Sequence, residues 1–268
     1  MKIGLVGGGA MGEAIVSAVV KAKVATADDI QLAEYYQPRL DYMRDTYGVR
    51  TATTADVASG VDVLMLAVKP QDFDNAARMM GASMGNATAV SIMAGITIDN
   101  LSRSFGTDRV VRSMPNTPAQ IGEGMTAWTA TPAVDETARK YAQQIFAAMG
   151  KEAYVPDEKY LDMVTALSGS GPGYVFLFIE ALIDAGVYVG LSRDLATTMA
   201  LQTVIGSARY AQATGKGIAE LRNQVTSPAG TTAEGLKALE AGGMRSAVLE
   251  AVIAAYEKSK ALGGADKK

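Results

Sequence analysis

The chain of 268 residues contains no cysteine and no histidine. Without cysteine there is no disulfide bond, no thiol nucleophile and no thiolate metal ligand. Without histidine there is no imidazole acid or base, no Ser-His-Asp triad and no histidine-ligated zinc, and we expect no metal site. Any proton transfer must therefore use a carboxylate, a lysine, a tyrosine, a hydroxyl group or water.

A basic surface is also lacking, because the net charge is −3 and the isoelectric point is about 5.2. Nucleic acid and anionic membranes are therefore not expected as partners. The chain begins with a strand pattern, Met1–Val6, and not with a signal-peptide layout. The most apolar helical run, Tyr174–Val189, carries two acids and is too short to span a bilayer. We expect a soluble, cytoplasmic protein.

Strand and helix patterns alternate over the first half of the chain, which predicts a parallel sheet with helices on both faces. A first helix is expected from Gly12 to about Lys23, a second near Pro38–Tyr47, and a third from Thr131-Pro132 to about Met149. The predicted strands are Ile3–Val6, Ile30–Glu34, Val61–Val68, Ala87–Met93, Arg109–Ser113 and Lys151–Val155.

From about Asp157 the strand patterns disappear and helical periodicity dominates. We therefore predict two domains, 1–156 with the sheet and 157–268 with helices alone. The second is very apolar for its length, which favours burial of its helices in a dimer. Its expected helices are 158–167, 173–189, 193–214, 217–224, 231–241 and 244–262, followed by a polar tail, 263–268.

The segment Gly7-Gly8-Gly9-Ala10-Met11-Gly12 fits the pattern G-x-G-x-x-G between the first strand and the first helix. Gly7 allows a tight turn, Gly9 lets the backbone approach a pyrophosphate, and Gly12 lets the helix pack closely on the strand. This context favours dinucleotide binding over a merely tight strand-to-helix turn.

Glu34 ends the second predicted strand, 22 residues after Gly12. A carboxylate there accepts hydrogen bonds from the adenosine ribose and repels a 2′-phosphate, which favours NAD(H). Arg39 lies nearby and could neutralise a phosphate if Glu34 turns away. The alternative is a solvated glutamate at a strand end.

Ligands bind at the carboxyl ends of parallel strands, so the segments after the next strands are also candidates. Lys69, in Ala67–Pro70, either faces the cofactor or extends into solvent from a strand end. Ser91–Gly95 would lie under the nicotinamide. Asn116, between two prolines, either presents its amide to a ligand or belongs to a rigid connector.

A second candidate anion site is the turn Val225–Thr232. Pro228 fixes one φ angle and Gly230 permits an unusual one, and the threonines that follow open an apolar-periodic helix. Backbone N–H groups and two hydroxyls would then converge, as a carboxylate requires. The alternative is plain helix capping, since Thr231 and Glu234 have the spacing of a capping box.

Two further features have open interpretations. Glu180 and Asp184 lie one turn apart on a predicted helix and could form a metal site or an acid–base pair, although a solvated or interface face is favoured. The glycine-rich run Ser168–Gly173 is either an anion-binding nest or, as we prefer, a tight helix entry.

Together these segments resemble the pyrroline-5-carboxylate reductase family. The matching pieces occur in the family's order over essentially the whole chain: Gly7–Gly12, Ala67–Pro70, Met114–Pro118, Leu167–Tyr174 with Phe178–Ala181, and Ser227–Thr232. The resemblance implies an α/β fold, a Rossmann-type doubly wound parallel sheet followed by an all-α dimerisation domain. It also implies NADP(H), with NAD(H) as an alternative, interlaced dimers that assemble further into rings, and an active site between the cofactor domain and helices partly from the partner.

By match of position, the resemblance assigns the substrate carboxylate and ring nitrogen to Gly230, Thr231 and Thr232, with Thr232 as hydrogen-bond partner or proton relay for the nitrogen. Ala229 stands where many members have glycine, so we expect a negative φ there. Glu34 replaces a small polar residue of NADPH-using members, which leaves the cofactor preference open. Besides Glu34, the predicted cofactor contacts are Val6, Gly7, Gly8, Gly9, Ala10, Met11, Thr54, Ala67, Val68, Lys69, Pro70, Met93, Ala94 and Gly95.

The expected reaction is hydride transfer from nicotinamide C4 to the C=N carbon of 1-pyrroline-5-carboxylate, which gives L-proline, the last step of proline biosynthesis. An imine suits a protein without histidine, because its nitrogen arrives partly protonated. A related hydroxyacid dehydrogenase would need a lysine in Tyr174–Ile179, and none is there. A cofactor-binding redox sensor or scaffold without turnover would not need the threonine turn.

Overall fold

The computed structural model describes residues 1–81 and 84–264, and these form two compact units. The first contains Met1–Ser170 together with the chain from Ala254 on, and the second contains Gly171–Ile253. The predicted division at residue 156 does not coincide with this one. Residues 157–170 pack with the sheet, because Glu158 accepts hydrogen bonds from Arg112 Nη1 at 2.6 Å and from the Ile98 N–H at 2.7 Å.

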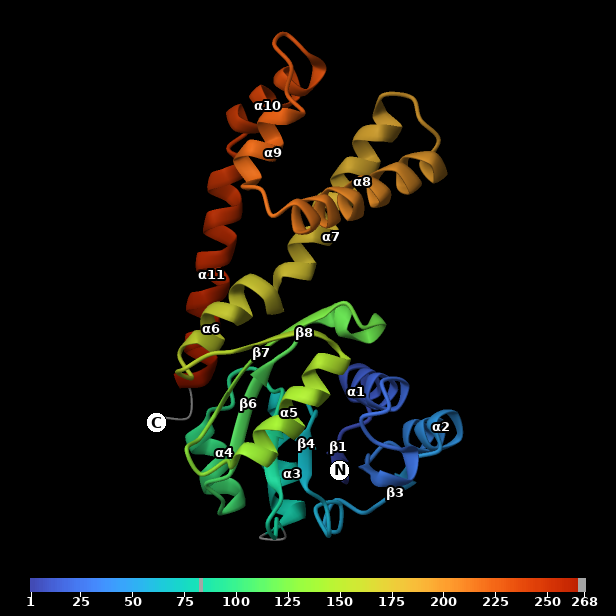
Figure 1. The fold of residues 1–268 in the computed structure, drawn as a ribbon, viewed down its shortest axis with the longest axis vertical. Coiled ribbons are helices and arrows are strands. Elements are labelled where there is room, and N and C mark those ends of the chain that lie inside the picture. Colours follow the sequence, from blue (N-terminus) through green and yellow to red (C-terminus); the bar gives the residue numbers. More distant parts are fainter. Residues whose placement is uncertain (82–83, 265–268) are drawn as a thin grey trace. The chain divides into compact units, whose positions relative to one another are not determined.

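The first unit is built on one eight-stranded sheet with the strand order β3-β2-β1-β4-β5-β6-β7-β8 (Figure 1). Neighbouring strands are parallel except for β6 and β7, which are antiparallel. The strands are β1 (Ile3–Val6), β2 (Ile30–Ala33), β3 (Arg50–Thr51), β4 (Val63–Leu66), β5 (Thr88–Ser91), β6 (Val110–Met114), β7 (Gly124–Ala130) and β8 (Gly150–Tyr154).

Helices cover both faces of this sheet, as a doubly wound fold requires. They are α1 (Ala10–Lys21), α2 (Gln37–Tyr47), α3 (Phe73–Met80), α4 (Ile98–Phe105), α5 (Glu136–Ala148) and α6 (Tyr160–Val164). Short 3-10 turns at Ala27–Asp29, Pro70–Asp72 and Thr117–Ile121 connect them to the strands.

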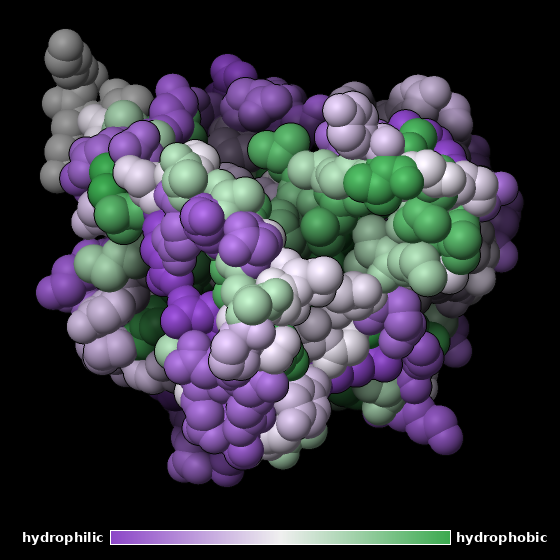
Figure 2. Space-filling view, turned by 90° about the horizontal axis from the view of Figure 1, so that it is seen from above, coloured by the Kyte–Doolittle hydropathy of each residue, from purple (hydrophilic) through white to green (hydrophobic). Residues whose placement is uncertain are grey.

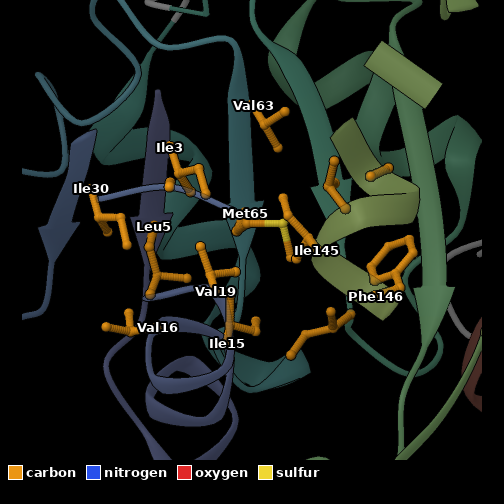
Figure 3. Close-up of a cluster of buried hydrophobic side chains, with 14 of the residues drawn as sticks. Ile3, Leu5, Ile15, Val16, Val19, Ile30, Val63, Met65, Ile145 and Phe146 are labelled. Carbon is orange, nitrogen blue, oxygen red and sulfur yellow. The ribbon is translucent and has the colours of Figure 1, made fainter. Parts of the chain in front are cut away.

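Alternating side chains of the central strands divide the core into two layers. Leu5 of β1 and Met65 of β4 pack with Ile15 of α1 and Ile145 and Phe146 of α5, as Figure 3 shows. The opposite face carries Leu64 and Leu66 of β4, covered by residues of α3 and α4 that include Phe73, Leu101 and Phe105. The predicted fold class is therefore confirmed, with the carboxyl ends of β1, β2 and β4 at one edge.

At the end of the sheet, one strand is missing from the prediction and one helix start is wrong. Strand β7 was not anticipated, since its sequence, Gly-Met-Thr-Ala-Trp-Thr-Ala, is rich in small and weakly apolar residues. The third helix begins at Glu136 and not at Pro132, because the backbone N–H of Thr131 still bonds to the Val110 carbonyl at 3.0 Å. Asp135 caps this helix, and its carboxylate accepts from the Ala138 N–H at 2.9 Å.

The segment Ser168–Gly173 contains the start of a helix, as the preferred interpretation expects. A π turn over Thr165–Gly169 joins α6 to α7 (Gly171–Tyr188), and the Ser170 N–H bonds to the Thr165 carbonyl at 2.8 Å. A Cβ on Gly169 would lie 2.8 Å from Met114 Cε. The glycine thus allows this turn to pass close to the end of β6, and π turns inside helices occur often at functional sites.

The second unit contains helices alone. They are α7, α8 (Arg193–Thr214), α9 (Ile218–Gln224), α10 (Thr231–Ala241) and the first part of α11 (Met244–Gly264). The predicted helices 193–214 and 231–241 are confirmed to the residue. Part of the predicted polar tail, residues 263–264, belongs to α11, and the rest, residues 265–268, lies outside the described residues.

This helical unit leaves its large apolar residues unburied within one chain, and its buried apolar residues are Ala196 and Ala200. None of the residues of α7, α9 or α10 is buried. Hydrophobic side chains gather in a hollowed area on the face seen in Figure 2. The large exposed hydrophobic residues of the unit are Val175, Phe176, Leu177, Phe178, Tyr188, Val189, Leu195, Met199, Leu201, Ile205, Tyr210, Ile218, Val225, Leu239, Met244, Val248, Leu249 and Ile253.

Within the part of the chain that the structure describes, one helix is long and apolar enough to cross a membrane by length and composition. It is the continuous run Tyr160–Tyr188 of 29 residues, with a mean hydropathy of 1.4 in its most apolar window. We expected Tyr174–Val189 to be too short to span a bilayer. That expectation is wrong about the length, because the π turn lets the helix extend back to Tyr160. One such helix is weak evidence for a membrane, since the core helix of a soluble protein passes the same test of length and composition.

Candidate active site

The glycine turn lies between β1 and α1, and its three motif glycines meet three different steric demands. Gly7 has φ +100°, and a Cβ there would lie 2.7 Å from the Ala67 carbonyl oxygen. A Cβ on Gly12 would lie 2.0 Å from the Gly7 carbonyl oxygen, so helix and turn touch. Gly9, by contrast, faces open space, with no described atom within 4 Å of an added Cβ. It is also the N-cap of α1, and no side chain caps this helix. The turn therefore has the room and the donors that a pyrophosphate needs.

A cleft of about 500 Å³ opens beside this turn at the carboxyl ends of β1, β2 and β4. It is lined by eight of the predicted cofactor residues, namely Val6, Gly7, Gly9, Glu34, Thr54, Ala67, Val68 and Lys69. Gly8, Ala10, Met11 and Pro70 belong to the same turns but do not line the cleft. The structure thus brings most of the predicted cofactor contacts to one place, from four different segments of the chain.

Glu34 points at the glycine turn. Its Oε2 accepts a hydrogen bond from the Gly8 N–H at 2.7 Å, and its Oε1 accepts one from the Tyr36 N–H at 2.9 Å. The interpretation as a merely solvated glutamate is wrong, because two backbone N–H donors, of Gly8 and Tyr36, hold the carboxylate in place. A carboxylate offers about four lone-pair positions, so two remain for hydroxyl donors of a ligand.

Arg39 of α2 lies under the same turn. Its Nε donates to the Gly8 carbonyl, and its Nη2 forms an ion pair with Glu13 of α1. Glu13 also accepts hydrogen bonds from the hydroxyls of Tyr47 at 2.8 Å and Tyr42 at 2.9 Å. Burial opposes ionisation of Glu13, but the hydrogen bonds from Arg39, Tyr47 and Tyr42 outweigh it and lower the pKa of its carboxyl group. Glu13 is therefore an ionised partner of Arg39 at neutral pH.

Apart from Ala33 and Arg39, six residues of the cleft are not among the predicted cofactor contacts. Tyr35 and Tyr36 follow Glu34 and are highly exposed, at 89% and 60%. The others come from the segment after β4 and from α3: Asp72, Asn75, Ala76 and Met79. Two consecutive tyrosines directly after a strand-end acid were the available signal in the sequence, since aromatic rings at the end of a strand can stack on a planar ligand.

The predicted residues after β5 do not line the cleft. The Met93 side chain is buried in the core layer with α3 and α4. Gly95 has φ +76°, and a Cβ there would lie 3.1 Å from Leu262 Cβ of α11. The nicotinamide contact of Met93, Ala94 and Gly95 stays a prediction.

Asn116 forms a connector in the described structure. Its Nδ2 donates to the Ser168 carbonyl and to Ser168 Oγ, both at 3.3 Å, and its Oδ1 accepts from the Met125 N–H at 2.9 Å. These bonds occupy both ends of the amide, which favours the rigid connector over a ligand contact. Asn116 thus fixes the π turn against the sheet.

The threonine turn belongs to the helical unit. The N-cap of α10 is Gly230, and no side chain forms a cap hydrogen bond, so the predicted capping box of Thr231 and Glu234 is wrong. Both Thr231 and Thr232 are exposed. A Cβ on Gly230 would lie 2.4 Å from Ser227 Oγ, which explains why glycine stands there. The start of α10 therefore offers backbone donors and two hydroxyls to a ligand.

The expectation of a negative φ at Ala229 is wrong. Ala229 has φ +55°, in the left-handed region that glycine adopts without cost. The turn keeps the conformation that a glycine would have, and alanine accepts the strain. Strained backbone persists only where the surrounding structure requires it. The shape of this turn is therefore fixed by its surroundings and not by the conformational preference of Ala229.

Glu180 and Asp184 do not form a metal site with a third ligand. Asp184 pairs with Arg193 at 2.9 Å, and both side chains are more than half exposed. Across residues 1–81 and 84–264, no group of three or more acidic side chains comes together in a way that could hold a metal ion. The interpretation as a solvated or interface face is favoured.

Comparison with known proteins agrees with this geometry. Residues 158–262 match the family model described as pyrroline-5-carboxylate reductase dimerisation, and residues 2–95 match the one described as NADP oxidoreductase, coenzyme F420-dependent. The pyrroline-5-carboxylate reductase of Synechocystis is 42% identical over 98% of both chains, and that of Escherichia coli is 38% identical over 97% of this chain and 98% of the other. A solved pyrroline carboxylate reductase of Plasmodium falciparum, with NADP bound, superimposes with a TM-score of 0.89 at 33% identity over 98% of both chains. The chain belongs to the pyrroline-5-carboxylate reductase family.

Proposed function

We propose that the chain reduces 1-pyrroline-5-carboxylate with its dinucleotide in the cleft beside the glycine turn and its substrate carboxylate on Gly230, Thr231 and Thr232. The activity itself, NAD(P)H-dependent formation of L-proline as the last step of proline biosynthesis, follows from family membership. The observation that carries the assignment of residues is the open space at Gly9, where a side chain would fill the position of a pyrophosphate.

The chain's own residues bind and orient the reactants. When bound, the cofactor supplies a hydride from nicotinamide C4. The C=N electron pair then moves to the ring nitrogen, which enters protonated, so the product is a neutral amine and no strong acid is needed. Backbone N–H groups at the start of α10 would hold the carboxylate, and Thr232 Oγ1 would accept a hydrogen bond from the ring N–H, which keeps its proton. Orientation of this kind contributes about 7–11 kcal/mol in well-oriented systems.

A spectrophotometric assay of NAD(P)H oxidation tests the reaction against the two alternatives. We expect turnover with 1-pyrroline-5-carboxylate and none with a 2-keto acid. Turnover with the keto acid alone would indicate a hydroxyacid dehydrogenase. Binding of cofactor without turnover of either substrate would indicate a sensor or scaffold.

Two substitutions test the proposed sites. Gly9→Ala keeps the fold, since the added methyl group meets no described atom within 4 Å, but raises the KM for the cofactor at least about tenfold. Thr232→Ala lowers kcat/KM for the imine more than about threefold if Thr232 contacts the ring nitrogen. Thr198→Ala is the matched control, because it removes another exposed threonine of the helical unit. Equal activity of the Thr232 and Thr198 variants would refute the role of Thr232.

Self-association follows from the dimerisation model that covers residues 158–262. We propose that the assembly is a dimer, or a ring of dimers, supported by the unburied apolar side chains of the helical unit. A monomeric mass by light scattering would contradict this. The cytoplasmic location and the absence of nucleic-acid and membrane partners stay predictions, which cell fractionation would test.

A further inference from the structure

The adenosine end of the cleft carries an unusual set of charges. At the carboxyl end of β2, where a dinucleotide places its adenosine ribose, the described structure holds one carboxylate that faces the cleft, Glu34, and one cation, Arg39. The other cation among the lining residues, Lys69, follows β4. Recognition of a 2′-phosphate therefore depends on whether the positive charge of Arg39 is free to pair with it and whether the carboxylate of Glu34 can move away.

Arg39 is already committed to other groups. Its guanidinium bonds to the Gly8 carbonyl, lies 3.5 Å from the Gly9 carbonyl and pairs with Glu13. The side chains of Arg39 and Glu13 are 27% and 24% exposed, so water screens the pair only in part. The guanidinium carbon also lies 4.9 Å from the centre of the Tyr42 ring. A 2′-phosphate would have to compete with an ionised carboxylate for this cation.

Glu13 is fixed in its turn. The hydroxyls of Tyr42 and Tyr47 both donate to its Oε1, and Arg39 bonds to its Oε2, so both oxygens have partners from α2. Tyr47 is at the last turn of α2 and Arg39 at the first, so the pair is tied to the whole length of that helix. Release of Arg39 would therefore cost several hydrogen bonds together.

Glu34 cannot turn away without loss either. Its two backbone partners, the Gly8 and Tyr36 N–H groups, would be left unpaired if the carboxylate moved. The formal charges of Glu34, Glu13 and Arg39 add up to −1 at the position of the 2′-phosphate. The phosphate itself would add a charge of about −2 there. A ribose with a free 2′-hydroxyl instead finds the unused lone pairs of Glu34.

We propose that Glu13 and Glu34 together make this enzyme select against the 2′-phosphate, so that NADH is a more efficient reductant for it than NADPH. Glu34 acts by direct repulsion, and Glu13 acts as a positioning residue that neutralises Arg39. This inference rests on the proposed function and on the placement of the dinucleotide in this cleft. It does not exclude NADPH, but it makes NADPH the poorer cofactor.

The test is the ratio of kcat/KM for NADH to kcat/KM for NADPH, with 1-pyrroline-5-carboxylate saturating. We expect a ratio of about 10 or more for the unmodified enzyme. Glu34→Gln should lower that ratio at least about tenfold, mainly through a lower KM for NADPH. Glu13→Gln, which frees Arg39, should lower it about three- to tenfold. Asp28→Asn is the control, because it removes the same charge from an exposed position outside the cleft and should leave the ratio within about twofold.

A direct titration of the unmodified enzyme with NAD⁺ and NADP⁺ gives the same answer without a variant or a substrate. A Kd for NADP⁺ at or below that for NAD⁺ would overturn the proposal, as would an unchanged ratio in a folded Glu34→Gln enzyme. If neither reduced cofactor supported turnover, the proposed function would fail, while the two binding constants would still decide the selectivity.

Discussion

Replacement of Ala229 by glycine is expected to stabilise the helical unit, although it removes a side chain. Ala229 has φ +55°, and a non-glycine residue in this left-handed region costs about 1–2 kcal/mol. Glycine relieves that strain but adds about 0.4–1 kcal/mol of unfolded-state entropy. The difference between the midpoints of these two ranges predicts a net gain of about 0.8 kcal/mol. The turn keeps its shape, so we expect the KM for the imine to stay within about twofold.

Ala241→Gly is the matched control for this change. Ala241 is the last residue of the same helix, α10, is exposed, and does not have a positive φ. The substitution Ala241→Gly has the same entropic cost but relieves no strain, so it should destabilise α10 by about 0.5–1 kcal/mol. The two variants then differ by about 1–2 kcal/mol, which isolates the strain at residue 229.

Hydrogen–deuterium exchange of the α10 amides is the suitable assay, because it measures the opening free energy of this helix and not that of the whole chain. Slower exchange in Ala229→Gly than in the parent enzyme, with faster exchange in Ala241→Gly, is the expected pattern. Equal destabilisation by both glycines would refute the reasoning, since it would mean that residue 229 carries no strain.

Three further predictions concern the sheet unit. Gly12→Ala places a methyl group 2.0 Å from the Gly7 carbonyl oxygen and should cost about 3 kcal/mol by urea denaturation, whereas Gly9→Ala should cost less than about 1 kcal/mol. Glu158→Ala leaves Arg112, whose side chain is 5% exposed, without its ion partner. The free energy of unfolding should fall by about 2–3 kcal/mol, which is less than for a fully buried pair because Glu158 is partly solvated. A loss below about 0.5 kcal/mol would contradict this. The Ala138 N–H and then Arg109 hold the pKa of Asp135 below its usual 3.8, so its contribution to stability is complete above that pH and disappears as the pH falls through the lower folded value. In Asp135→Asn, the urea midpoint should therefore decrease less steeply as the pH falls below 3.8. An unchanged pH dependence would show that ionised Asp135 does not contribute to stability in this way.

The elements that could be predicted from the sequence are those whose ends carry local signals. Helix α8 begins after Ser192, whose hydroxyl accepts from the Leu195 N–H, and ends at Gly215 with φ +63°. Both signals act over three or four residues, so they can be read without knowledge of the fold. The predicted and observed ranges of this helix are the same for that reason.

Strand β7 shows where local signals fail. Thr126 and Trp128 are buried by their position in the sheet and not by an apolar pattern of the strand itself. Trp128 Nε1 bonds to Glu152 of β8, 24 residues further along the chain, and its ring packs against Phe146 of α5. The pairing of β7 with β6 and β8 therefore comes from tertiary contacts, and a strand of small residues between two prolines of the sequence gave no sign of it.

The site divides in the same way. The glycine turn could be predicted because its glycines occur at a fixed spacing, where Gly7 and Gly12 meet close neighbours and Gly9 leaves open space. The neutralisation of Arg39 could not, since its partner Glu13 is 26 residues away and the tyrosines that fix Glu13 come from the next helix. From the sequence, Arg39 is a cation near a phosphate, and in the structure its Nε and Nη2 are already bonded to the glycine turn and to Glu13. Because the two situations favour opposite cofactors, the selectivity of this enzyme is a property of how α1 packs on α2, and not of the strand-end residue alone.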